Sequence, residues 1–153
     1  MVARKTTSKK SFAANSPSPR SIERLASTVF FVDRSLGKRI VAQALRDAGA
    51  VVEVHDDHFP QDATDVEWLT AAGKHNWVVL SKDKQIRRNP LERAAIASAS
   101  VKAYFLTQQG ISGPEMAAIF VQALPGMVSR AASQPGPFIY TISRAGVLAR
   151  LKQ

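Results

Sequence analysis

Three aspartates stand at points of the chain where a carboxylate is well placed for chemistry. Asp33 directly follows the apolar run 29–32, Asp83 follows the apolar run 77–80, and Asp65 opens a segment with helical spacing. An aspartate at the start of a helix is also a common N-cap, and any one of them alone would indicate no more than that. Three acids that recur in this way predict a shared site.

The chemistry follows from gathering carboxylates in one place. Uncompensated negative charges raise one another's pKa, so a cluster of this kind calls for a cation. Oxygen ligands in a chain without cysteine favour Mg²⁺ or Mn²⁺ over zinc. Such a cation orients a phosphodiester, lowers the pKa of an attacking water and stabilises the leaving oxygen. The aspartates therefore predict phosphodiester hydrolysis.

The elements that must position these acids can be inferred from hydrophobic periodicity. Apolar runs rich in β-branched and aromatic residues predict five strands, at 29–32, 51–54, 77–80, 101–106 and 137–142. Helical spacing predicts helices over 35–48, 64–73, 91–98 and 112–130, the last one interrupted or bent at Pro125-Gly126. This alternation predicts an α/β sandwich with a mostly parallel five-stranded sheet, in which the carboxyl ends of the strands share one edge.

Residues between the aspartates have local explanations that compete with a functional one. Thr64 and Glu67 have the spacing of a capping box, and Asp65 lies in a first turn, where the helix dipole favours an acid. Residues 55–62 form a polar loop with two histidines, but ligands crowded together in sequence converge poorly on one ion. We expect this loop at the rim of the site.

Composition places limits on the class of protein. The 153 residues are 45% hydrophobic and 22% charged, as in an ordinary globular domain. The absence of cysteine excludes disulfides and a cysteine nucleophile, and it fits a cytoplasmic location. No apolar stretch has the roughly 18–20 residues that a membrane span requires, so we expect no membrane association.

The net charge of +9 is unevenly distributed. Residues 1–20 contain five of the 21 basic residues and no acid, and they are rich in Ser, Thr, Ala and Pro. We predict a disordered basic arm over residues 1–24, followed by one domain over residues 25–153. Such an arm attracts nucleic acid phosphates, although a solvated tail or an organelle transit peptide has a similar composition.

Three segments resemble a known family. Residues 31–37, 65–69 and 79–84 are similar to the PIN-like domain nucleases, in particular to the small branch placed among the VapC-type toxins of bacterial toxin-antitoxin pairs. The resemblance covers roughly residues 28 to 107. It implies a PIN-like three-layer sandwich with a five-stranded parallel sheet, and a metal-dependent ribonuclease that is usually a homodimer and often held inactive by a cognate antitoxin. By that match Asp33, Asp65 and Asp83 are the catalytic, metal-binding acids, and Ser81 orients them.

Many PIN relatives carry a fourth acid just after the third, where this chain has Lys84, Gln85 and Ile86. The remaining candidates for this ligand are Glu67 and Glu92. Basic residues near the acids in sequence are predicted to hold RNA phosphates, or else to be a solvated loop; they are Arg34, Lys84, Arg87 and Arg88.

These observations favour a Mg²⁺- or Mn²⁺-dependent endoribonuclease, the toxin of a toxin-antitoxin pair. The missing fourth acid leaves open a catalytically weak or inactive PIN-like module that binds RNA or a protein partner. A phosphoacceptor receiver domain would need an acid pair on the first strand, and a dinucleotide-binding domain would need a G-x-G-x-x-G motif. The chain has neither feature.

Overall fold

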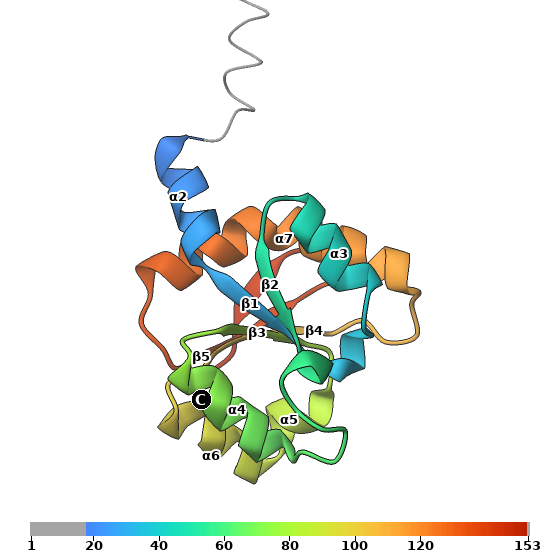
Figure 1. Cartoon of the computed structure of the whole chain (residues 1–153), viewed down its shortest axis with the longest axis vertical. Coiled ribbons are helices and arrows are strands. Elements are labelled where there is room, and N and C mark those ends of the chain that lie inside the picture. Colours follow the sequence, from blue (N-terminus) through green and yellow to red (C-terminus); the bar gives the residue numbers. More distant parts are fainter. Residues whose placement is uncertain (1–17, 153) are drawn as a thin grey trace, which may run out of the picture.

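The computed structural model describes residues 18–152, which fold around one six-stranded sheet (Figure 1). The strand order is β2-β1-β3-β4-β5-β6, and every neighbouring pair is parallel except β5 and β6. The strands are β1 (Val29–Val32), β2 (Val51–Val54), β3 (Val78–Ser81), β4 (Lys102–Leu106), β5 (Phe138–Ile142) and β6 (Leu148–Arg150). The five predicted strands are thus confirmed.

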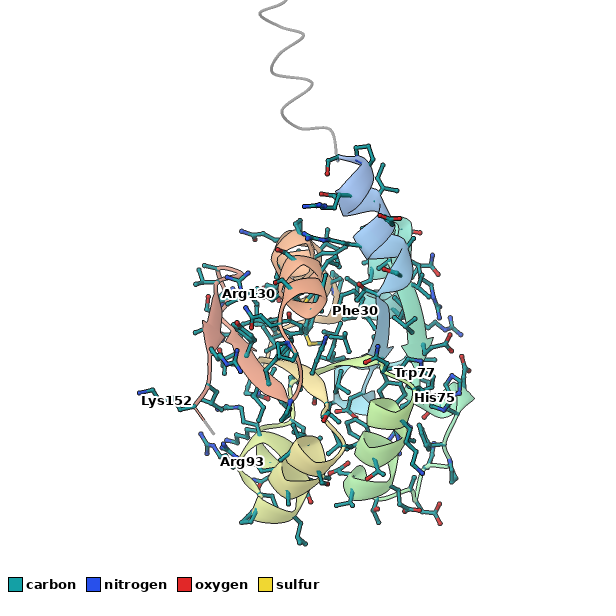
Figure 2. The ribbon with its side chains drawn as sticks, turned by 90° about the vertical axis from the view of Figure 1, so that its left-hand side faces the viewer. Phe30, His75, Trp77, Arg93, Arg130 and Lys152 are labelled. Carbon is teal, nitrogen blue, oxygen red and sulfur yellow. The ribbon has the colours of Figure 1, made fainter. Side chains whose placement is uncertain are left out.

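Helices cover both faces of the sheet, which confirms the predicted α/β sandwich of three layers (Figure 1, Figure 2). One face is covered by α2 (Pro19–Ser27), α3 (Ile40–Asp47) and α7 (Gly113–Ser133). The other face is covered by α4 (Asp65–Lys74), α5 (Lys84–Arg88) and α6 (Pro90–Ser98). Two short 3₁₀ helices follow strands, η1 (Arg34–Leu36) after β1 and η2 (His55–Asp57) after β2.

The strands are buried on both faces because each face packs against a helical layer. In β1, Phe30 and Val32 point into the core formed with α3 and α7, whereas Phe31 points into the core formed with α4 and α6. Phe31 stacks on Trp77, with ring centroids 5.4 Å apart. This two-sided burial holds β1 rigidly at the centre of the sheet, and β1 delivers Asp33.

The sixth strand, β6, is not among the five predicted strands, the last of which ends at residue 142. Gly146 adopts a φ of +80°, and the amide of Ser143 donates to the carbonyl of Val147. This turn brings residues 148–150 back alongside β5 as an antiparallel edge strand. Glycine reaches such a positive φ without strain, which is why the chain reverses there.

The helix predicted over residues 35–48 is wrong in its first half. Gly37 has a φ of +83°, which ends η1, and α3 begins only at Ile40. Residues 37–39 therefore form an exposed connection beside Asp33. Residues 84–88, where no helix is predicted, form the short helix α5. The helix predicted over residues 112–130, interrupted or bent at Pro125-Gly126, is not interrupted there, since α7 includes Pro125 and ends at Ser133.

Most of the predicted arm, residues 1–17, lies outside the described residues. Its last part is helical and not disordered, since α2 begins at Pro19 with Ser18 as its N-cap. Among residues 18–152 we find no helix with both the length and the apolar character that crossing a membrane requires.

Candidate active site

Asp33 is the most buried acid of the candidate site, with 5% of its surface exposed. Its amide donates to the carbonyl of Leu80, so the backbone is fixed where β1 ends beside β3. Its Oδ2 accepts two hydrogen bonds, from Ser81 Oγ at 2.7 Å and from Ser35 Oγ at 2.8 Å. The orientation of this carboxylate is therefore set by two hydroxyls.

The two serines are themselves held by backbone amides. Ser81 Oγ accepts from the amide of Asp83 at 3.0 Å, and Ser35 Oγ accepts from the amide of Lys82 at 3.1 Å. The segments that follow β1 and β3 are thereby tied together around Asp33. Ser81 is fully buried, so water does not reach its hydroxyl, whereas Ser35 is only partly buried.

The environment of Asp33 opposes its ionisation. Burial raises the pKa of this carboxyl above its ordinary value of 3.8, the hydrogen bonds from Ser81 and Ser35 lower it in part, and the nearby charge of Asp65 raises it again. The net effect is a raised pKa. A carboxylate kept in such a position is more typical of a functional site than of a structural one.

The other two predicted acids come from the starts of helices. Asp65 is the first residue of α4, and its Oδ1 accepts from Trp68 Nε1 at 2.9 Å. Asp83 is the N-cap of α5, and its Oδ1 accepts from the amide of Gln85 at 2.9 Å. For both acids, Oδ2 has no hydrogen-bond or ion-pair partner among residues 18–152.

Asp33, Asp65 and Asp83 line one cleft of about 500 Å³. The structure thus brings together three side chains from distant parts of the chain, at the edge where the strands end. Within the described part of the chain, however, no three acids or histidines are close enough together to hold a metal ion as they stand. The acids share a cleft without forming a closed ligand shell.

The structure separates the two candidates for a fourth acid. Glu67 is engaged in the predicted capping box, where its Oε1 accepts from the amide of Thr64 at 2.8 Å, and this bond lowers its pKa. Glu92, on α6, has a pKa raised first by burial and then by the charges of Asp65 and Asp83. Glu92 is not among the residues that line the cleft, but the charges of two cleft acids act on it, whereas Glu67 already has a structural role.

The predicted RNA-binding residues divide into two groups. Arg34 lines the cleft beside Asp33. Lys84, Arg87 and Arg88 lie on α5 and are not among the residues that line it. Arg87 is partly buried, and this burial together with the charge of Arg88 lowers its pKa. Three of the four predicted residues thus stand outside the cleft.

Three further residues of the cleft were missed by the sequence analysis, namely Ser35, Gly37 and Lys38, whereas Asp56 and Gln61 belong to the loop that was predicted at the rim. Lys38 Nζ lies 3.2 Å from Asp56 Oδ2, and this contact lowers the pKa of Asp56. Ser35 could have been predicted, because a hydroxyl two residues after Asp33 can donate a hydrogen bond to its carboxylate. Lys38 carried no signal because it was placed inside a helix.

The loop over residues 55–62 lies at the rim, as predicted, since Asp56 and Gln61 both line the cleft. Its histidines have other environments. His55 is buried among the rings of Phe31, Phe59 and Trp68, and His58 Nε2 lies 2.6 Å from Glu53 Oε1. The arrangement gives no support to a histidine metal site in this loop.

Comparison with known proteins agrees with this fold. Residues 28–108 match the family described as PIN like domain, and the chain belongs to that family. The protein named "Putative ribonuclease VapC45" of Mycobacterium tuberculosis (strain ATCC 25618 / H37Rv) is 35% identical to the chain over 116 residues, which are 73% of this chain and 83% of the relative. No solved structure matches the chain. The resemblance inferred from the sequence is confirmed.

Proposed function

We propose that this protein is a metal-dependent endoribonuclease that hydrolyses RNA phosphodiester bonds. The observation that carries the proposal is Asp33, which is buried and bonded to two serine hydroxyls at the wall of a cleft lined by two more acids. It makes no side-chain cap bond to η1, and no cation of the described residues forms an ion pair with it. A buried carboxylate without these structural partners costs stability, which favours a functional reason for it.

The comparison supports the same reaction. The mycobacterial relative carries the name of a ribonuclease, and the matched length includes most of both chains. Asp33, Asp65 and Asp83 all fall inside the region that matches the PIN-like family. An activity on RNA is therefore the interpretation that the fold, the cleft and the relative favour together.

The aspartates of the cleft offer carboxylate oxygens as ligands. Oxygen ligands of this kind suit a hard divalent cation. Asp33, Asp65 and Asp83 would hold Mg²⁺ or Mn²⁺, and Glu92 is the better placed of the two candidates for a further ligand. When bound, such a cation supplies an acidified water and charge stabilisation at the leaving oxygen. Asp65 and Asp83 each offer a free Oδ2 within the described part of the chain, while the two serines hold Asp33 in one orientation.

The biological role that we propose is the toxin of a bacterial toxin-antitoxin pair, acting in the cytoplasm and held inactive by a cognate antitoxin. The similarity to a VapC protein supports this role. Induced expression in bacteria should arrest growth for the wild-type protein and not for Asp33→Asn. Arrest by both proteins would contradict a toxicity that depends on cleavage.

The direct test of the reaction is cleavage of a mixed RNA pool by the purified protein with Mn²⁺, with Mg²⁺ and with a chelator. We expect metal-dependent cutting that Asp33→Asn abolishes. Asp47→Asn is the matched control, because Asp47 lies exposed at the end of α3, bonded to Gln43, and does not line the acid cleft. It should cut as the wild type does.

Two results would overturn the proposal. Equal cutting by Asp33→Asn and the wild type would remove Asp33 from the reaction. No cutting under any metal condition, with intact RNA affinity, would favour the alternative of a PIN-like module that binds without cleaving. The separation of the acids in the described residues is the observation that keeps this alternative in view.

A further inference from the structure

A second hollow of about 730 Å³ lies next to the acid cleft. The two share four lining residues, Arg34, Ser35, Gly37 and Lys38, so they form one continuous depression across the connection between β1 and α3. The second hollow ends at Gly113 and Met116, in the first turns of α7. The depression follows the segment between η1 and α3, where Gly37 ends η1 and α3 has not yet begun.

The charge of the second hollow is opposite to that of the acid cleft. Arg34, Lys38 and Arg39 line it, all three are exposed, and no acid is among its lining residues. Lys38 stands where the two hollows join and is held there by Asp56. The guanidinium of Arg39 has no ion-pair or hydrogen-bond partner among the described residues, and only its backbone carbonyl accepts a bond, from the amide of Gln43. A row of exposed cations beside a cluster of acids suits a ligand with several negative charges along its length.

The floor of the second hollow is apolar. Leu36 and Met116 are buried there, and Ile40 is 51% exposed. Gly113 allows the close approach of Ile40, since a Cβ on Gly113 would lie 2.9 Å from Ile40 Cδ1. An apolar surface flanked by cations offers contact to the face of a base while the cations hold phosphates.

We infer that single-stranded RNA runs from the acid cleft into this second hollow. Lys38 and Arg39 hold backbone phosphates, and the base next to the bond in the acid cleft rests on the exposed side chain of Ile40. The inference rests on the proposed function for the choice of RNA as the ligand. On this inference the main RNA-binding element is the segment 34–40, and not the predicted basic residues on α5.

Binding measured without cleavage tests this path. The full-length Asp33→Asn protein is titrated against a labelled single-stranded RNA in the presence of a chelator at several salt concentrations. In this background Lys38→Gln and Arg39→Gln should each weaken binding and reduce the salt slope, by about 0.7 for each phosphate that the variant no longer neutralises. Ile40→Gln should weaken binding without a change in the slope, because it removes an apolar contact.

Two matched variants serve as controls. Lys74→Gln removes the same charge at the carboxyl end of α4, at the opposite end of that helix from Asp65 and next to His75, which Figure 2 labels. Ile22→Gln alters a side chain on α2 that is 54% exposed, close to the exposure of Ile40. Both controls should bind RNA as the Asp33→Asn protein does.

The path would be overturned if the salt dependence of RNA affinity had the same slope for Lys38→Gln, Arg39→Gln and the control Lys74→Gln. This holds even if the wild-type protein cleaves RNA. Equal affinities of Ile40→Gln and Ile22→Gln would overturn the apolar contact. Reduced slopes for the two cation variants would support the path even if the wild-type protein failed to cleave, and the nuclease proposal alone would then fail.

Discussion

Ser81→Ala is the substitution that tests how the site is held together. Ser81 Oγ donates to Asp33 Oδ2 at 2.7 Å, accepts from the amide of Asp83 at 3.0 Å, and lies 3.2 Å from Ser35 Oγ. Its side chain is fully buried at the end of β3. Alanine keeps the backbone and removes all three contacts, so the effect reflects the hydrogen bonds with little change in packing.

The expected cost can be worked from these contacts. A hydrogen bond to a charged group contributes about 1.5–3 kcal/mol, and a donor left without a partner costs about 1–3 kcal/mol when buried. The donor that would lose its partner is the amide of Asp83. Because Asp83 is only half-buried, water can bond to this amide and reduce the second cost. We therefore expect Ser81→Ala to lower the free energy of unfolding by about 2–4 kcal/mol, which for a chain of this length lowers the melting temperature by roughly 5–15 °C.

The assay is urea unfolding followed by circular dichroism and tryptophan fluorescence, with a chelator present so that no cation contributes. Ser133→Ala is the control, because Ser133 is exposed at the end of α7 and its Oγ donates only to the carbonyl of Ser129 within the described residues. It should change stability by less than about 0.5 kcal/mol. In an Asp33→Asn background the bond from Ser81 becomes neutral, and Ser81→Ala should cost only about 1 kcal/mol.

Two outcomes would refute this reasoning. One is a cost for Ser81→Ala as small as that of Ser133→Ala. The other is an equal cost in the wild-type and Asp33→Asn backgrounds, which would mean that the charge of Asp33 contributes nothing to the bond.

Two further predictions concern the pH dependence of stability and the packing of α4. Because burial raises the pKa of Asp33 above 3.8 in the folded state, its contribution to stability is greatest at low pH and is lost as the pH rises through the folded-state pKa. Asp33→Asn should therefore gain stability relative to the wild type as the pH rises above about 4, and a constant difference in unfolding free energy from about pH 3 to about pH 7 would contradict this. Gly73→Ala would place a Cβ 2.3 Å from the carbonyl oxygen of Ala99 and should destabilise by about 1–3 kcal/mol in urea unfolding. In Gly126→Ala the added Cβ would meet only the ends of side chains, so this variant should leave the unfolding free energy nearly unchanged. Equal changes in unfolding free energy for the two variants would show that α4 and α6 are not tightly apposed.

The local features of this protein could be predicted from its sequence. Strands such as residues 29–32 and 51–54 were predictable because an apolar run of β-branched and aromatic residues suits a strand buried on both faces. The capping box of Thr64 and Glu67 was predictable because both of its hydrogen bonds lie within four residues. The three aspartates could be expected to meet because parallel strands end at a common edge.

Other local features misled the sequence analysis. Helical spacing from Leu36 to Ala48 outweighed Gly37, whose positive φ breaks the segment. Lys84, Arg87 and Arg88 follow Asp83 in the chain, but the turn into α5 places them outside the cleft. Proximity in sequence was a poor guide here, because a helix distributes neighbouring side chains over all of its faces.

What the sequence by itself determined is the alternation of strands and helices and the identity of the acids, since these depend on periodicity and on the rules of parallel sheets. Only the tertiary structure decided how the acids are held and what surrounds them. Ser35 and Ser81 are 46 residues apart and meet on Asp33 because β1 and β3 are neighbours. The contact of Lys38 with Asp56 arises in the same way, from the packing of separate elements, which no local pattern encodes.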